Sequence, residues 1–239
     1  MTPGSADHPS HEARRWPSEE PFARRGEVSR ATRSQVHETI GSVLVALTVD
    51  AEHPDHPTTD PSGNAGRLLD VLSAGKSRAT FFVQSSWAGA FPDLTKRIVD
   101  EGHLLGSHSH WHCIFTSLSD AGIADDLARS RSILGAYSDT GNCFRLPGGA
   151  GFDDSRVLTA VAAAGYQHVP WSCGGNDWEP GRTAEEVATP IIDSIRAANP
   201  GLSIPLLHSW PDPSARALEI VLDELKGEAN FVRLDQLPA

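Results

Sequence analysis

The chain has 239 residues, a formal net charge of −11 at pH 7 and a sequence pI near 5.4. Its length allows one large α/β domain. A surface this acidic argues against a nucleic-acid partner and against an anionic membrane, because both are recognised by basic faces. No stretch of the sequence approaches the length and apolarity of a membrane span.

The first part of the chain differs in composition from the rest. Residues 1–41 are rich in Pro, Ser, Glu, Arg and His and have little apolar content, which predicts a disordered tail ahead of one domain at 42–239. The arginine pairs at 14–15 and 24–25 are not followed by an apolar run of leader length. We therefore expect a cytoplasmic location by default and leave an extracytoplasmic one open.

From residue 42 onward, short apolar runs alternate with amphipathic segments. The run at 43–49 is apolar and β-branched, as expected for a strand that is covered on both faces. Further strands are predicted at 79–83, 103–107, 143–146, 167–171, 203–207 and 231–234. Helices are predicted at 62–74, 92–101, 120–137, 153–164, 183–198 and 214–226. This alternation implies a parallel sheet, either closed into a barrel or doubly wound.

Polar side chains with chemical potential follow the predicted strands. Asp50 and Glu52 come after the first strand, and His108 and His112 come after the third. Arg145, Asp177 with Trp178, and His208 accompany the later strands. In parallel α/β folds the carboxyl ends of the strands form one rim, where catalytic groups collect. We therefore expect residues spread over much of the chain to meet at that rim.

The segment G-S-H-S-H-W-H at 106–112 holds three histidines. His108 and His112 have the spacing of two imidazoles that converge on one metal ion. Alone, this spacing fits a polar turn with surface histidines better than it fits a metal site. The surrounding motifs change that balance.

Five short segments follow one another along the chain: T-V-D-A-E at 48–52, H-S-H-W-H at 108–112, R-L-P-G-G at 145–149, G-G-N-D-W at 174–178 and L-L-H at 206–208. In this order they resemble the five motifs of the NodB-homology polysaccharide deacetylases, carbohydrate esterase family 4. The family patterns are T-F-D-D-G, H-[ST]-x-x-H, R-x-P-Y-G, D-x-x-D-W and L-x-H. The resemblance covers residues 42–236 and implies a distorted (β/α) barrel of parallel strands with outer helices.

The resemblance also implies a chemistry. The protein is expected to be a metal-dependent hydrolase that removes acetyl groups from N-acetylated sugars of peptidoglycan, chitin-type oligomers or a related amino sugar, with an acetyl ester as an alternative bond. The cofactor is one divalent ion, zinc in first place and cobalt or nickel as alternatives. Its ligands would be Glu52, His108 and His112. The partner is a carbohydrate substrate, and the oligomeric state is left open.

The remaining motif residues receive roles by the same resemblance. Asp50 would be the general base, and Arg145 would hold it ionised. His208 would protonate the leaving group, and Asp177 would orient it. The substrate would contact Trp178, Leu206, Pro147, Gly148 and Trp111. Gly148 would act through its backbone N–H.

The chain departs from the family pattern in its first motif. Ala51 stands at the usual ligand position and cannot bind a metal, so the longer side chain of Glu52 is assigned as the ligand. In a competing register, Asp50 is the ligand and the base is either missing or Glu52. Two alternative functions also stay open: hydrolysis of a cyclic amide or imide, and carbohydrate binding with weakened catalysis.

Overall fold

The computed structural model of the chain describes residues 43–52, 64–137 and 142–237. The predicted tail at 1–41 lies outside these residues, so the division into a tail and one domain stays a prediction. None of the helices in the described ranges is long and apolar enough to cross a membrane.

The strands form two sheets, and every strand pairing in the described ranges is parallel. The larger sheet has the order β6-β5-β4-β3-β2-β9-β7, and the smaller has the order β10-β1-β8. The bounds are β1 Val43–Ala46, β2 Thr48–Ala51, β3 Thr80–Val83, β4 Leu104–Ser107, β5 Cys143–Phe144, β6 Gln167–His168, β7 Cys173–Gly174, β8 Leu202–Ser203, β9 Pro205–His208 and β10 Ala229–Val232. The predicted parallel sheet is therefore confirmed.

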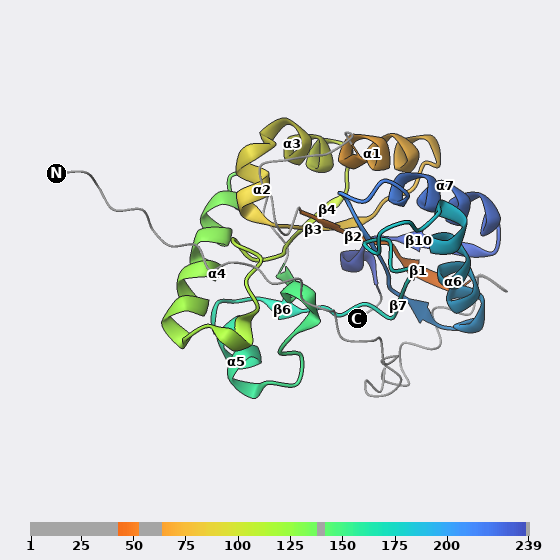
Figure 1. The fold of residues 1–239 in the computed structure, drawn as a ribbon. Helices are drawn as coiled ribbons and strands as arrows, with labels where there is room; N and C mark the ends of the chain where they lie inside the picture. Colours follow the sequence, from red (N-terminus) through yellow and green to blue (C-terminus); the bar gives the residue numbers. More distant parts are fainter. Residues whose placement is uncertain (1–42, 53–63, 138–141, 238–239) are drawn as a thin grey trace.

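Helices surround the curled larger sheet (Figure 1). Their bounds are α1 Asn64–Ala74, α2 Ser85–Ala90, α3 Pro92–Asp100, α4 Asp120–Leu134, α5 Ser155–Ala163, α6 Ala184–Ala197 and α7 Ser214–Glu224, with short 3₁₀ turns at Phe115–Ser117, Pro147–Gly149 and Leu234–Gln236. The edge strands β6 and β7 do not pair with each other within the described ranges, so the barrel is open on one side. This is the distorted barrel that the sequence predicts.

Local sequence signals fix where several helices begin. Ser119 accepts a hydrogen bond from the N–H of Gly122 and caps α4, and Asp154 caps α5. Thr183 and Glu186 form a reciprocal capping box at the start of α6. Such caps satisfy N–H groups that have no partner inside the helix, and each stabilises its helix by about 1 kcal/mol.

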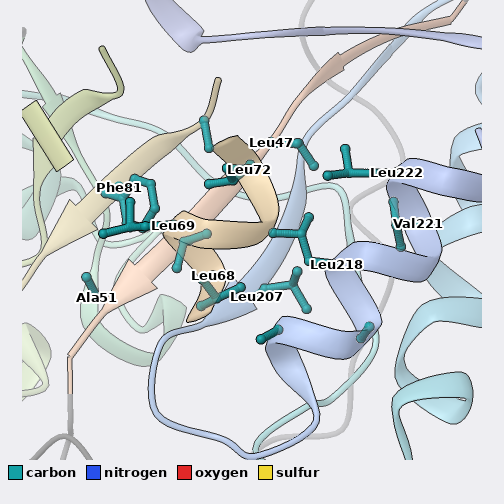
Figure 2. Packing of buried hydrophobic residues seen from close by; sticks show 14 of the residues in the cluster. Leu47, Ala51, Leu68, Leu69, Leu72, Phe81, Leu207, Leu218, Val221 and Leu222 are labelled. Carbon is teal, nitrogen blue, oxygen red and sulfur yellow. The ribbon is translucent and has the colours of Figure 1, made fainter. Parts of the chain in front are cut away.

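The outer face of the larger sheet packs against α1 and α7 through an apolar core (Figure 2). Val49 and Ala51 of β2 belong to this core. The side chains labelled in the figure are Leu47, Ala51, Leu68, Leu69, Leu72, Phe81, Leu207, Leu218, Val221 and Leu222. Side chains alternate along a strand, so Thr48, Asp50 and Glu52 point to the opposite face, inside the barrel. The packing of the helices thus determines which residues face the interior.

Two predicted strands are each divided between the sheets. The run at 43–49 breaks at Leu47, so that β1 pairs with β10 and β8 while β2 pairs with β3 and β9. The run at 203–207 breaks at Ile204 in the same way, and β8 pairs with β1 while β9 pairs with β2. These two segments, β1–β2 and β8–β9, lie side by side, and both pass from the smaller sheet to the larger one. As a result Asp50 and His208 lie within strands, not after them as predicted.

Candidate active site

A buried ion pair links Asp50 of β2 to Arg145, the residue that follows β5. Arg145 Nη1 donates to Asp50 Oδ1 and to Thr48 Oγ1, each at 2.9 Å. The guanidinium also lies over the Phe82 ring, with its carbon 4.1 Å from the ring centroid. Burial lowers the pKa of Arg145, and the Asp50 carboxylate opposes that change. Asp50 therefore has a fixed cationic partner inside the barrel.

A second carboxylate, on the residue that directly follows β2, lies beside the two spaced histidines. Glu52 Oε2 lies 2.8 Å from His112 Nε2 and 3.1 Å from His108 Nε2. One ligand atom from each of these three side chains can be chosen so that all lie within 4.8 Å of one another. Asp50 Oδ2 is further away, 3.6 Å from His108 Nε2. The structure therefore brings Glu52, His108 and His112 together, with Asp50 at the margin of the group.

The donor atoms of this group fit a divalent metal ion. His108 Nδ1 lies 2.9 Å from the carbonyl oxygen of Arg145, which can only accept, so Nδ1 carries a proton and Nε2, which faces Glu52, is the nitrogen left for a metal ion. Glu52 Oε2 is buried and makes no hydrogen bond of acceptable geometry with any described residue. A buried acceptor without a hydrogen-bond partner, next to imidazole nitrogens, is suited to binding a cation. Zinc is bound by sets of one carboxylate and two imidazoles of this kind.

The carboxylates and imidazoles of this group shift one another's pKa values. Burial would raise the pKa of Glu52, but the nearby His112 and His108 hold it well below its usual range. Burial would lower the pKa of His108, but the carboxylates of Asp50 and Glu52 raise it. The carboxylates and the imidazoles of this group therefore each favour the charged form of the other.

On the other side of β2, a histidine and an aspartate form a closed pair. His208 Nδ1 lies 2.8 Å from Asp177 Oδ1, and the backbone N–H of His208 donates to Asp177 Oδ2 at 2.7 Å. Ser214, the first residue of α7, donates to the same Oδ2 at 2.6 Å. Burial would lower the pKa of His208, but Asp177, with smaller contributions from Glu52 and Asp50, raises it to about 9. His208 is therefore protonated at neutral pH.

Strand register brings the two halves together. Asp50 of β2 and His208 of β9 are direct partners in the parallel pairing of the two strands. Paired residues on neighbouring strands point to the same face, and the strands lie about 4.8 Å apart. His208 therefore faces the interior next to Asp50, and Glu52 lies two residues beyond Asp50, directly after β2.

Of the five residues predicted to contact substrate, Leu206 and Trp178 lie next to His208. Leu206 is buried and pairs with Thr48, two residues before His208 on the same face. The Trp178 ring stands edge-on to the His208 ring, with 5.2 Å between centroids. Pro147 is buried and Gly148 has a φ of +59°. Trp111, between the two spaced histidines, has 55% of its surface exposed.

One glycine of the third motif is required by a close approach. A Cβ on Gly149 would lie 2.8 Å from Trp171 Cη2, and the residue has a φ of +65°. Only glycine is compatible with both constraints. The 145–149 segment is thus held close to the aromatic ring that also lies 5.8 Å from the Arg145 guanidinium carbon.

Two residues at the site escaped sequence reasoning. The Ser209 hydroxyl accepts the N–H of Glu52 at 3.0 Å and donates to the Glu52 carbonyl at 3.1 Å, which holds the end of β2 in place. Ser214 is the third donor to Asp177. Ser209 directly follows the fifth motif, and this adjacency is the one signal that could have drawn attention to it. Ser214 has no such signal, because a serine at a helix start is common.

Comparison with known proteins decides the family. The family described as polysaccharide deacetylase matches residues 38–169, more than half of the chain. The chain belongs to the polysaccharide deacetylase family. The match includes the first three motifs, and Asp177 and His208 lie beyond it.

Individual relatives of this polysaccharide deacetylase family extend the match. The chain is similar to the peptidoglycan N-acetylmuramic acid deacetylase of Bacillus subtilis, at 32% identity over 181 residues, which are 74% of this chain and 66% of that protein. It is also similar to a chitooligosaccharide deacetylase of a Bradyrhizobium species, at 32% identity over 186 residues, covering 77% of this chain and 78% of that one. The alignment thus spans just under two thirds of the Bacillus subtilis protein.

A solved structure agrees with the fold. The family 4 carbohydrate esterase from Streptomyces lividans, determined in complex with acetate, aligns with a TM-score of 0.67 and 26% identity over 80% of this chain and 92% of that one. The predicted family, the distorted barrel and the assignment to the polysaccharide deacetylase class of enzymes are therefore confirmed. The roles of individual site residues stay predictions.

Proposed function

We propose that this polysaccharide deacetylase family member is a metal-dependent deacetylase of N-acetylated amino sugars. The proposal rests on the placement of a candidate metal site and a histidine–aspartate pair on one interior face. Glu52, His108 and His112 converge on one side of Asp50, and the protonated His208 is its partner on the other. Metal-assisted hydrolysis of an amide requires a metal site, a general base and a general acid. The Glu52 group, the Asp50 carboxylate and the charged His208 imidazole can fill these three roles.

Glu52, His108 and His112 would hold the ion, and Asp50 would be left free to act as a base. A divalent ion held there would supply a lowered pKa for a water molecule and polarisation of the acetyl carbonyl. Asp50, fixed by Arg145 at 2.9 Å, takes the proton of the attacking water. The ion pair keeps the Asp50 carboxylate oriented and able to accept that proton.

The second half of the reaction depends on His208. Its Nδ1 is hydrogen-bonded to Asp177 at 2.8 Å, so the proton on its Nε2 is the one that can be transferred to the leaving amine. Asp177 is in turn fixed by Ser214 and by the His208 backbone, so the imidazole has little freedom to rotate. The raised pKa of His208 keeps it in the acid form at neutral pH.

The substrate class rests on the relatives and on the rim. The relatives are named as deacetylases of peptidoglycan N-acetylmuramic acid and of chitooligosaccharides, so an N-acetylated sugar of one of these kinds is the first choice. Leu206 and Trp178 would border the space for the acetyl methyl group, and the Gly148 N–H would face the oxyanion. The exposed ring of Trp111 offers an apolar face on which a sugar ring can stack.

The test is acetate release by the purified chain. The protein is stripped with a chelator, reloaded with zinc, cobalt or nickel, and incubated in parallel with chito-oligosaccharides and with peptidoglycan fragments. We expect acetate from at least one substrate in the reloaded protein and none in the stripped protein. Asp193→Asn, an exposed change on α6, serves as the control and should match the wild type.

Other results would contradict the proposal. Metal uptake without acetate release from any N-acetyl or O-acetyl sugar would exclude a deacetylase. Sugar binding without turnover would favour the carbohydrate-binding alternative. Ring opening of a cyclic amide by a protein that holds no metal would favour the cyclic amide hydrolase.

A further inference from the structure

The loop that carries both histidines has an unusual backbone. Ser109 has a φ of +67° and His112 a φ of +56°, a left-handed conformation that residues other than glycine rarely adopt. Residues in this region cost of order 1 kcal/mol or more each and persist where the surroundings hold them. The histidine loop, defined as residues 108–112, therefore needs contacts from outside itself.

A buried carboxylate on α4 supplies such contacts. Asp126 Oδ1 accepts the N–H of His110 at 2.8 Å, and Oδ2 accepts the N–H of Trp111 at 3.1 Å. Only 3% of the Asp126 surface is exposed. Among the described residues no lysine, arginine or histidine side chain forms an ion pair with Asp126. The loop's own backbone is thus the main group that compensates its charge, ahead of the more distant His110 imidazole and Arg129 guanidinium.

Such an arrangement is expensive for stability alone. A buried carboxylate without a cation is destabilising, and burial raises the pKa of Asp126 while the two N–H donors oppose that rise. A neutral acceptor could fill this position with a smaller desolvation penalty. What the carboxylate provides is two acceptors at fixed spacing for two consecutive peptide N–H groups midway between His108 and His112.

The opposite side of the loop is anchored by α2. Ser85 Oγ lies 2.8 Å from His110 Nδ1, and Ser86 Oγ donates to the His110 carbonyl at 2.7 Å. The Ser85 N–H donates to the Ser109 carbonyl at 3.0 Å. His110 therefore attaches the loop to α2. Asp126 is the only contact of the loop with α4 that binds two of its peptide groups at once, as far as the described residues show.

We propose that Asp126 is a positioning residue that holds His108 and His112 in the geometry that binds one metal ion. The inference rests on the proposed metal-dependent function. The two ligands flank the peptide groups that Asp126 binds, so a shift of those groups displaces both imidazoles relative to Glu52. Residues that orient metal ligands in this indirect way typically contribute about 10-fold to 100-fold to metal affinity.

The experiment measures the metal affinity of variants of the full chain. Zinc and cobalt dissociation constants are obtained by competition with a chelator, the cobalt absorption spectrum is recorded, and the melting temperature of each stripped protein is determined. Asp126→Ala removes both acceptors, and Asp126→Asn keeps the shape, so folding is retained while one N–H loses its acceptor. Asp125→Ala is the matched control, since Asp125 is exposed, pairs with Arg129 and changes the charge by the same amount.

We expect Asp126→Ala to weaken metal binding by about 10-fold to 100-fold, Asp126→Asn to weaken it less, and Asp125→Ala to match the wild type. The cobalt spectrum should change in the Asp126 variants only. A lower melting temperature with an unchanged metal affinity and spectrum would show a purely structural role and overturn the proposal. A wild-type protein that binds no metal would refute the metal-dependent function as well, which separates the two failures.

Discussion

Two buried carboxylates at this site, Glu52 and Asp177, both lie beside imidazoles but are satisfied in opposite ways. Glu52 Oε2 has two imidazole nitrogens within 3.1 Å and no hydrogen bond among the described residues. Asp177 accepts from the His208 ring, the His208 N–H and the Ser214 hydroxyl. A buried polar atom without a partner points to a missing ligand, whereas a satisfied pair needs none.

The difference also separates the roles of the histidines. His108 presents its Nε2 to Glu52 because Nδ1 is held by the Arg145 carbonyl. His208 presents Nδ1 to Asp177, which leaves its Nε2 for a substrate. This contrast supports our proposal that His108 and His112 donate lone pairs to a cation and that His208 acts as an acid. The four predictions below each disturb one side of this comparison.

The largest effect is expected from Glu52→Ala. Glu52→Ala takes away the one carboxylate of the Glu52, His108 and His112 group, so bound metal should be lost and acetate release should fall by on the order of 10⁴-fold. Elemental analysis and an acetate assay check both. Ala51→Asp should not rescue this variant, since Ala51 belongs to the apolar core under α1. Stoichiometric metal in Glu52→Ala would assign the carboxylate ligand to another residue.

Asp50→Asn should separate catalysis from metal binding. The asparagine retains the shape but cannot take a proton, so kcat should fall by on the order of 10³-fold while the metal content stays that of the wild type. Metal titration of the variant beside Glu52→Ala distinguishes the two registers of the first motif. Loss of metal in Asp50→Asn together with retention in Glu52→Gln would establish the competing register.

These two variants test the point at which sequence reasoning was weakest. Alternating apolar runs predicted the parallel sheet, and the positions of polar residues near strand ends predicted that they meet. Hydrophobic pattern cannot tell which strand a run will pair with, so the breaks at Leu47 and Ile204 and the two-residue strand β7 were missed. The six-residue helix α2 was missed because it is too short to show a periodicity.

The site divides in the same way. Residues inside a recognisable motif, such as His112 and Arg145, could be proposed from sequence. Their supports could not, because Ser209 contacts Glu52 across 157 positions and Asp126 belongs to a helix with a weak apolar pattern. Hydrogen bonds between distant segments follow from tertiary packing, and local sequence carries no signal for them.

Asp177→Asn should change the pH dependence more than the metal content. His208 must be protonated to act, so activity in the wild type should be lost as the pH rises through about 9. Without the carboxylate the pKa should fall toward its ordinary value of about 6.5, which leaves only a few per cent of the acid form at pH 8 and a loss of about 30-fold there. Rate profiles between pH 5 and 10 check the shift. An unchanged alkaline limb would mean that another group is the acid.

The smallest effect is expected from Ser214→Ala, which removes one of three donors to Asp177 and leaves the ion pair intact. A buried hydrogen bond to a charged group contributes about 1.5–3 kcal/mol, so the free energy of unfolding should fall by about that amount while activity drops only a few-fold.

The raised pKa of His208 stabilises the fold fully below about pH 6.5, and that contribution is lost as the pH rises through about 9. This pH dependence of stability should persist in Ser214→Ala and disappear in Asp177→Asn. Denaturant unfolding at pH 6 and pH 10 measures it, and loss of the dependence in both variants would mean that Ser214 sets the charge of the pair as well as its position.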